Sequence, residues 1–371
     1  MQNNKDCTNN SSISITTSNS SDDLKVCGSN LAGQLISDNT TYILIIVFQV
    51  SFTGVLAVGG IITNTINIVV FFKTGLSDSV NISLFGLAVG DLCSLIFSFW
   101  ESVCFNPLFH NIGAPVVFTE IEYITGCWPH VCFVRVTSYI TAFVTFERCL
   151  CIALPLKVKS IVTAGRTKGI IIVIFLIVMI TSIPEYYVSR LVYKFYPEKN
   201  RTLLGIYFIE DRARFEKVTL ILNNVVLQCL AFIAVLVCTV ILIVQLNRKA
   251  KWRKHAAKVE KSTLGKDKKV IKMISFVSVV FIVSNLPSCL VFVSMTSFPQ
   301  LHPTGVNRNM FYVVWSVVYV MESINSMVNI FIYINMSSKY SAIFYKMFSC
   351  RQVVVSNTAR SEHEISYIVS Y

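Results

Sequence analysis

Charged residues are scarce in this chain. Asp, Glu, Lys and Arg make up 14% of its 371 residues, whereas an ordinary soluble protein carries about 25%. Hydrophobic residues make up 54%, and the mean hydropathy is +0.62. A helix needs roughly 20 apolar residues to cross a hydrocarbon core about 30 Å thick. Seven stretches reach that length: 42–72, 80–104, 123–154, 169–188, 218–246, 270–295 and 310–334.

The alternation of apolar and polar residues that marks a transmembrane barrel is missing as well. Backbone groups in lipid must be bonded within the protein, so the seven stretches are expected to be helices. We therefore predict an all-α membrane protein whose seven-helix domain covers 42–334. A disordered, glycosylated polar tail at 1–41, an amphipathic helix on the membrane surface at 335–350 and a tail at 351–371 complete the expected organisation.

Metal-binding and catalytic clusters are missing too. The twelve cysteines show no C-x-x-C spacing and the five histidines are scattered, whereas a zinc site needs such ligands close together. We expect neither an enzyme nor a metalloprotein. The net charge of +12 does not predict nucleic-acid binding, because the basic run at 247–254 lies between two predicted spans. Membrane lipids and an acidic cytosolic partner are the expected targets of that charge.

A cleavable signal peptide is not expected, because no basic-then-apolar stretch opens the chain. The basic residues after the third and fifth spans lie on one side, which the positive-inside rule makes cytoplasmic. We therefore predict a multi-pass protein of the plasma membrane with its N-terminus outside. Glycosylation sequons on the outer side are at Asn9, Asn10, Asn19, Asn39 and Asn200.

A few polar side chains interrupt the spans. Glu147 and Arg148 are adjacent at the end of the third span, where a charge in lipid requires a partner or a function. Asp91 in the second span requires a cation, polar neighbours or a proton. Two alternatives remain open: a neutral Asp91, or a sodium ion held by Asp91 with Thr137, Asn325, Ser326 and Asn329. No other cofactor is expected.

Together these residues resemble the motifs of the rhodopsin-like (class A) G-protein-coupled receptors over about 42–350. Asn64 and the segment Leu87–Asp91 match the family's motifs in spans one and two, and Glu147-Arg148-Cys149 resembles its Asp/Glu-Arg-Tyr. In spans six and seven the matches are Phe281, Pro287, Asn325, Ser326, Asn329 and Tyr333. The run 133–159 is similar to divergent molluscan chemosensory receptors and to related invertebrate peptide receptors.

Several family features are absent. Tyr123 stands where the family has a cysteine, and the loop 189–216 has none, so the usual outer disulfide is not expected. A disulfide would require Cys104 or Cys127 to pair with Cys7 or Cys27. Asn285 replaces the tryptophan before the proline of span six, and Ile330 replaces the proline of span seven.

The resemblance implies a receptor that binds an extracellular peptide or chemosensory cue and activates a heterotrimeric G-protein. An arrestin is a further candidate partner. At rest, Arg148 would pair with Glu147 and with Asp267, and activation would swing span six outward at Pro287. The residues expected to serve coupling and activation are Glu147, Arg148, Asp267, Phe281, Pro287, Asn329 and Tyr333.

Candidate ligand contacts lie in the outer halves of the spans, at Glu101, His130, Asn285 and Glu322. Two carboxylates and a histidine suit a ligand with a basic group. Alternatively, Glu101 lies at the wet rim and His130 is hydrogen-bonded within the bundle. Arg135 either pairs with a carboxylate of the bundle or meets an acidic ligand.

Cys350 follows the predicted surface helix and is a palmitoylation candidate. The alternative to a receptor is a secondary transporter or channel of the plasma membrane. A transporter would show an internal repeat with broken helices, and a channel would show a ring of charge along a pore. The sequence displays neither.

Overall fold

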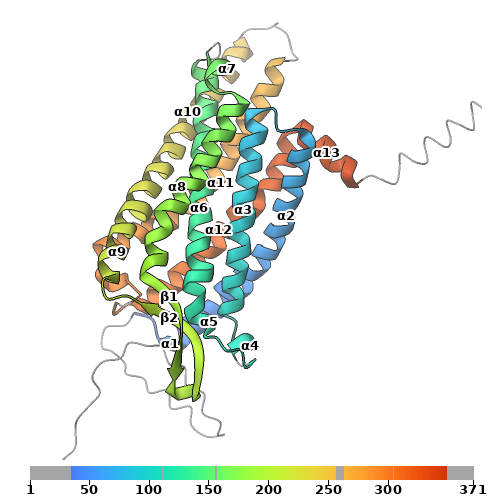
Figure 1. Ribbon diagram of the computed structural model, residues 1–371. Helices are drawn as coiled ribbons and strands as arrows, with labels where there is room; N and C mark the ends of the chain where they lie inside the picture. Colours follow the sequence, from blue (N-terminus) through green and yellow to red (C-terminus); the bar gives the residue numbers. More distant parts are fainter. Residues whose placement is uncertain (1–34, 111, 155–156, 256–262, 304, 349–371) are drawn as a thin grey trace, which may run out of the picture.

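The computed structural model describes residues 35–110, 112–154, 157–255, 263–303 and 305–348. Within them, seven helical spans are long and apolar enough to cross a membrane. Figure 1 shows these helices side by side in one bundle. The predicted seven-helix, all-α membrane fold is confirmed.

Three of the spans begin with shorter helical segments. The first consists of α1 (Asp38–Ile45), a π-helical turn η1 (Ile46–Phe52) and α2 (Thr53–Thr74). The third consists of α5 (Phe118–Glu122), η2 (Tyr123–Cys127) and α6 (Trp128–Ala153). The fifth consists of α9 (Arg212–Thr219), η4 (Leu220–Leu227) and α10 (Gln228–His255).

The remaining spans are single helices: α3 (Ser79–Cys104), α8 (Ala164–Val188), α11 (Thr263–Ser297) and α12 (Arg308–Met336). Short helices lie between the spans: α4 (Pro107–His110), α7 (Val158–Ile161), η3 (Pro197–Lys199) and η5 (Pro299–Leu301). After the seventh span the chain forms α13 (Ser338–Phe348).

The first span begins before its apolar stretch, at a polar cap. Its helix starts at Asp38, before the apolar stretch that starts at Tyr42, and the Ser37 side chain accepts a hydrogen bond from the Thr40 amide at 3.2 Å. Such a cap satisfies one of the free amides at a helix N-terminus. Length and apolarity predicted this span, and the cap marks where it begins.

A β-hairpin covers one end of the bundle, which is called the hairpin end below. Strands β1 (Ser189–Tyr196) and β2 (Arg201–Phe208) pair antiparallel, with Ser189 opposite Phe208. Their turn contains Asn200 in the left-handed conformation, with φ of 47°. The sequence did not predict this hairpin. The opposite end carries α7 and α13 (Figure 1), and it is called the Arg148 end.

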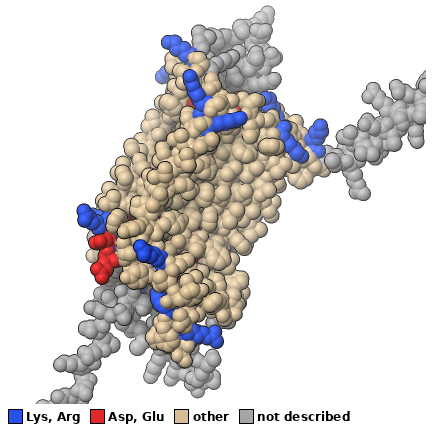
Figure 2. Space-filling model, viewed as in Figure 1, with Lys and Arg blue, Asp and Glu red and all other residues tan. Residues whose placement is uncertain are grey.

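Burial differs strongly among the spans. In their most apolar windows, 61% of α3 and 56% of α12 is buried, but only 22% of α8. The centre of the bundle is therefore built from α3, α6 and α12, whereas α8 leaves most of its surface open to lipid. The face shown in Figure 2 has an uncharged band between the Lys and Arg side chains at the two ends, as a bilayer requires.

Gly60 allows α2 and α3 to approach closely. A Cβ atom at this position would lie 2.6 Å from Leu95 Cδ1 of α3, which is closer than packed carbons come. Small residues at such crossings are typical of membrane helix packing, where van der Waals contact replaces the hydrophobic effect.

The helix α13 packs against the bundle through its apolar face. Ile343, Phe344 and Met347 lie against the main hydrophobic core, and Tyr340 is almost fully buried. Figure 1 shows α13 turning away from the axis of α12. The amphipathic helix expected from the sequence is thus present, and much of its apolar face contacts protein.

Candidate functional site

The polar interior of the bundle begins at Asp91 in α3, which is fully buried. Its two carboxyl oxygens accept hydrogen bonds from α12. Ser326 Oγ donates to Oδ1 at 3.0 Å, and Asn329 Nδ2 donates to Oδ2 at 2.9 Å. Asn64 of α2 donates to the Ser326 backbone carbonyl at 2.8 Å. Three spans therefore meet at one carboxyl group.

Two of the residues expected around Asp91 do not reach it. The Thr137 hydroxyl donates to the Val134 carbonyl of its own helix at 2.9 Å. Asn325 is half-buried and makes no hydrogen bond to the described residues. Among those residues there is also no cluster of three or more His, Cys, Asp or Glu side chains that could hold a metal ion.

The network continues from Asp91 toward α13. Asn67 donates to Asn64 Oδ1 at 3.1 Å, and Tyr340 donates its hydroxyl to Asn67 Oδ1 at 2.6 Å. Tyr340 also packs its ring against Phe71 and Tyr333. The sequence reasoning missed Tyr340, since nothing in the amphipathic pattern of α13 indicates that a tyrosine there points inward.

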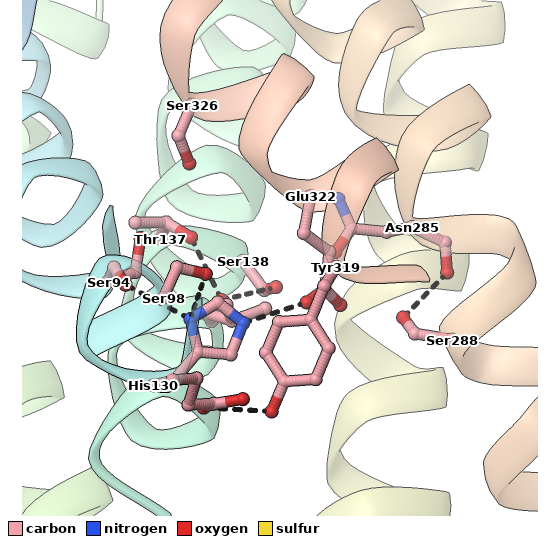
Figure 3. Close-up of polar contacts among 12 residues, drawn as sticks. Ser94, Ser98, His130, Thr137, Ser138, Asn285, Ser288, Tyr319, Glu322 and Ser326 are labelled. Carbon is pink, nitrogen blue, oxygen red and sulfur yellow. Dashed lines mark hydrogen bonds and ion pairs between the residues drawn. The ribbon is translucent and has the colours of Figure 1, made fainter. Parts of the chain in front are cut away.

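A second polar cluster lies nearer the hairpin end and is drawn in Figure 3. His130 Nε2 of α6 is 3.0 Å from Glu322 Oε2 of α12, and both side chains are buried. The other ring nitrogen is 3.1 Å from the Ser94 carbonyl and 3.3 Å from Ser98 Oγ. His130 is thus bonded on both nitrogens within the bundle, and the pair joins α6 to α12.

Glu101 belongs to the same region but has different partners. The Tyr319 hydroxyl donates to Glu101 Oε1 at 3.0 Å, and Gln49 Nε2 donates to Oε2 at 3.4 Å. The Tyr319 ring also lies 4.6 Å from the His130 ring, between centroids. Glu101 is 1% exposed, so the alternative that places it at a wet rim is wrong.

Asn285 and Pro287 lie within the continuous helix α11. Asn285 Nδ2 donates to the Phe281 carbonyl at 3.1 Å, while its Oδ1 atom is buried without a partner in the described residues. Ser288 Oγ donates to the Asn285 carbonyl at 3.0 Å. Proline removes a backbone donor from a helix, and side-chain hydroxyls of this kind satisfy the carbonyls nearby.

At the Arg148 end, Glu147 is buried and accepts two hydrogen bonds. Arg148 Nη2 and Ser79 Oγ both donate to Glu147 Oε1, the latter at 2.5 Å. One turn earlier, the hydroxyls of Thr145 in α6 and Ser278 in α11 are hydrogen-bonded at 2.8 Å. In this state the guanidinium is therefore held by the bundle, and the third and sixth spans are tied together beside it.

Three further residues are expected to serve coupling and activation, and the structure describes the side chains of two of them. Tyr333 is buried against Phe71, at 5.2 Å between ring centroids, and its hydroxyl has no partner in the described residues. Phe281 of α11 is also buried inside the bundle. The side chain of Asp267 lies outside the described part of the chain, so its pairing with Arg148 stays a prediction.

A bundle of seven spans around a polar interior, closed by an acid–arginine pair, is the architecture of serpentine receptors. The family model "Serpentine type 7TM GPCR chemoreceptor Srw" matches residues 49–351. The chain belongs to this family. None of the curated proteins matches the sequence significantly. As an Srw receptor, the chain is a multi-pass membrane protein of the GPCR type, whose partners in general are an extracellular ligand and a G-protein.

The hairpin of this Srw receptor is held to the third span without a disulfide. Cys104 and Cys127 are free thiols, while Cys7 and Cys27 lie outside the described residues. A single carboxyl oxygen, Glu120 Oε2 of α5, accepts hydrogen bonds from three groups of the hairpin. They are Tyr196 Oη at 2.8 Å, Lys194 Nζ at 2.8 Å and the Ile206 amide at 2.9 Å.

The charge of Lys194 strengthens this attachment. Burial alone would lower the pKa of Lys194, but its bonds to Glu120 and Tyr196 outweigh burial and raise it. A raised pKa means that the lysine contributes fully at neutral pH, and that its contribution is lost only as the pH rises past its ordinary value of 10.5. The Tyr123 ring adds a second link to the hairpin, since its centroid lies 5.5 Å from that of Phe208. Its hydroxyl donates to Glu216 of α9 at 2.8 Å and so joins the third span to the fifth.

The modification sites expected in this Srw receptor are described only in part. Asn39 in α1 and Asn200 in the hairpin turn are both exposed at the hairpin end. The other candidates lie outside the described residues: Asn9, Asn10, Asn19 and Cys350.

Proposed function

We propose that this Srw receptor binds an extracellular ligand inside its bundle and activates a heterotrimeric G-protein at the Arg148 end. The supporting observation is the buried Glu147–Arg148 pair beside the Thr145–Ser278 hydrogen bond. In this state Glu147 would keep the guanidinium of Arg148 from binding a G-protein. The motif matches favour a rhodopsin-like (class A) receptor of a divergent invertebrate type, similar to molluscan chemosensory and peptide receptors. An arrestin is a second candidate partner at the same end.

The proposed orientation puts the hairpin end outside the cell and the Arg148 end in the cytosol, at the plasma membrane. It is supported by the exposed sequons of Asn39 and Asn200, which are then open to glycosylation. It is also supported by the basic run 247–254 beyond the fifth span, since cytoplasmic loops are enriched in Lys and Arg.

Activation would require the Arg148 end to open. Moving α11 away from α6 breaks the Thr145–Ser278 hydrogen bond, and the bend at Pro287 provides the hinge. Releasing Arg148 from Glu147 then exposes its guanidinium to the G-protein. A ligand that moves the equilibrium from 1:99 to 99:1 must favour the open state by about 5.5 kcal/mol.

The ligand signal would reach this end through α12. Glu322 and Tyr319 of α12 bind His130 and Glu101 near the hairpin end. About two to three turns further along the same helix, Asn329 binds Asp91. A ligand that displaces Glu322 from His130 therefore acts on the helix that holds the central carboxyl group. Asn285, with its free buried oxygen, is a further candidate contact.

A sodium ion at Asp91 is also proposed as an allosteric ligand. The donor set suits a hard cation, because the Asp91 carboxyl and the Ser326 hydroxyl supply oxygen atoms within 3.0 Å of each other. Asp91 and Ser326 would hold the ion, which would stabilise an ionised Asp91. Thr137 and Asn325 would have to reorient to join them.

Basal nucleotide exchange tests the function without a known ligand. In liposomes that contain the full chain and a G-protein, Ser278→Ala should raise exchange above wild type, because it removes the link between α6 and α11. Adding Arg148→Ala should return exchange to the rate of the G-protein alone. Arg166→Ala is the matched control, since Arg166 lies at the same end and binds only the carbonyls of Ser160 and Ile161.

Exchange that persists in the Ser278→Ala, Arg148→Ala double variant contradicts the proposed role of Arg148. Substrate uptake or ionic current in liposomes without any G-protein favours the alternative, a transporter or channel.

A further inference from the structure

A narrow cavity lies among α6, α10, α11 and α12, beside the His130–Glu322 pair. Its walls include the apolar side chains Val131, Val134 and Phe292 and the polar side chains Arg135, Gln228 and Glu322. The centre of a water molecule can move through about 10 Å³ of it, which is room for roughly one water. A carboxyl group is larger than one water, so the walls of the cavity must move apart when the end group of a ligand enters.

Arg135 is the unusual member of the cavity wall. It is 3% exposed, and its guanidinium donates only to neutral groups. Nη2 donates to Asn224 Oδ1, and Nη1 lies 3.5 Å from Ser182 Oγ. None of the ion pairs among the described residues includes Arg135. The carboxyl group of Glu185 interacts electrostatically with the Arg135 guanidinium, but the two groups are too far apart to form an ion pair.

A buried arginine without a counter-charge within ion-pair distance needs an explanation, because a guanidinium cannot discard its charge. The buried carboxyl groups of this bundle can become neutral by binding a proton, but arginine stays protonated in proteins. Charges inside membrane bundles are costly and usually mark a ligand or ion path. The two neutral acceptors occupy only part of the five-donor fork of Arg135.

The other polar groups of the cavity fit an anionic end group. Glu322 also lines the cavity but forms no ion pair with Arg135, since its Oε2 atom lies 3.0 Å from His130 Nε2 instead. Trp315 also lines the cavity, and its Nε1 donor is buried without a partner in the described residues. Arg135 and Trp315 thus offer unused N–H donors. Carboxylates are bound well by such donors, and by arginine in particular.

We propose that the cavity binds the carboxylate of the receptor's ligand, with Arg135 as its counter-ion and Trp315 as a second donor. The carboxylate comes from a small organic acid or from the C-terminus of a peptide. This inference rests on the proposed receptor function and specifies the chemistry of its ligand. It replaces the basic ligand suggested by the acidic residues alone, because Glu322 and Glu101 are already bonded within the bundle.

Binding is measured on the purified full chain in detergent, from the rise in its thermal unfolding midpoint with added probe. The probes are acetate, butyrate, hexanoate, phenylacetate and triglycine, which sample small acids and a peptide C-terminus. The matched controls are the primary amides of the same compounds and the amines butylamine and phenethylamine. At least one carboxylate should raise the midpoint at millimolar concentration, and its amide should not.

Arg135→Gln then tests the assigned contact. Breaking one partner of a buried charge pair commonly costs 2 kcal/mol or more, so half-saturation should need about 30-fold more carboxylate. Arg212→Gln is the control, because Arg212 is paired with Glu216 at the hairpin end, and it should leave binding unchanged. Arg135→Lys keeps the charge and should retain binding. This variant tests the assigned contact if Arg135→Gln does not fold.

The outcomes separate this inference from the proposed function. If amines but not carboxylates stabilise the chain, or if no probe does, the carboxylate site is wrong whatever the exchange assay gives. The same holds if Arg135→Gln and Arg212→Gln bind a carboxylate equally well. If a carboxylate binds through Arg135 but leaves nucleotide exchange unchanged, the site stands and the G-protein function is contradicted.

Discussion

Replacing Glu120 with alanine should release the β1–β2 hairpin from the third span and leave the bundle folded. Hydrogen bonds to a carboxylate contribute about 1.5–3 kcal/mol when buried. Here the side chains are 26% exposed for Glu120 and 40% exposed for Lys194, so the lysine bond contributes little after solvent screening. The bonds from Tyr196 and the Ile206 amide then contribute about 1 kcal/mol each.

A loss of about 2 kcal/mol corresponds to about 30-fold more frequent local opening. Hydrogen exchange of the peptides that cover residues 189–208 measures this directly, whereas a global unfolding midpoint would not. Exchange in α6 should not change, because no bond of Glu120 reaches that helix. Lys194→Met removes the exposed pair with Glu120 and the bond from Nζ to the Ile206 carbonyl at 3.1 Å, and it should accelerate exchange less than Glu120→Ala does.

The reasoning fails if Glu120→Ala changes hairpin exchange by less than twofold. The backbone bonds of Leu204 would then carry the attachment alone: its amide donates to the Pro115 carbonyl at 2.8 Å, and its carbonyl accepts from the Val117 amide at 2.9 Å.

Two further predictions concern the interior of the bundle. Gly60→Ala should destabilise the receptor by about 1–3 kcal/mol, since its Cβ would overlap Leu95; adding Leu95→Ala should restore part of the loss in a denaturation assay, and no restoration would show that the strain lies elsewhere. Tyr340→Phe removes the bond to Asn67 but keeps the ring, so α13 should open about 2- to 10-fold more often in hydrogen exchange, for a loss of about 0.5–1.5 kcal/mol. Unchanged protection of α13 would mean that ring packing alone holds this helix.

Comparing the sequence with the structure shows which inferences depend on local pattern. The seven spans followed from length and apolarity, because a bilayer imposes both on any helix that crosses it. The Glu147–Arg148 pairing followed from adjacency in one helix. The approach of Ser326 and Asn329 to Asp91 followed from motif positions in two spans. The same motifs did not indicate that the Thr137 hydroxyl binds the Val134 carbonyl of its own helix in this state.

Other features involve partners far apart in the chain. Glu120 binds hairpin residues that lie 76 and 86 positions away in sequence. Nothing in the segment around Glu120 indicated that role. The sequence indicated residues 189–216 only as a loop between two spans, so the hairpin was not predicted. The His130–Glu322 pair joins residues 192 positions apart, and the sequence left open whether each faced a ligand or the other.

The sequence by itself determined that this chain is a seven-helix membrane protein, because transfer of backbone and side chains into lipid constrains composition residue by residue. Only the tertiary structure decided which buried charges are compensated. Packing brings Glu322 to His130, whereas in the described residues Glu101 and Arg135 have only neutral hydrogen-bond partners. Charge compensation depends on distances of a few ångströms between helices, and such distances are fixed by side-chain packing across the whole bundle.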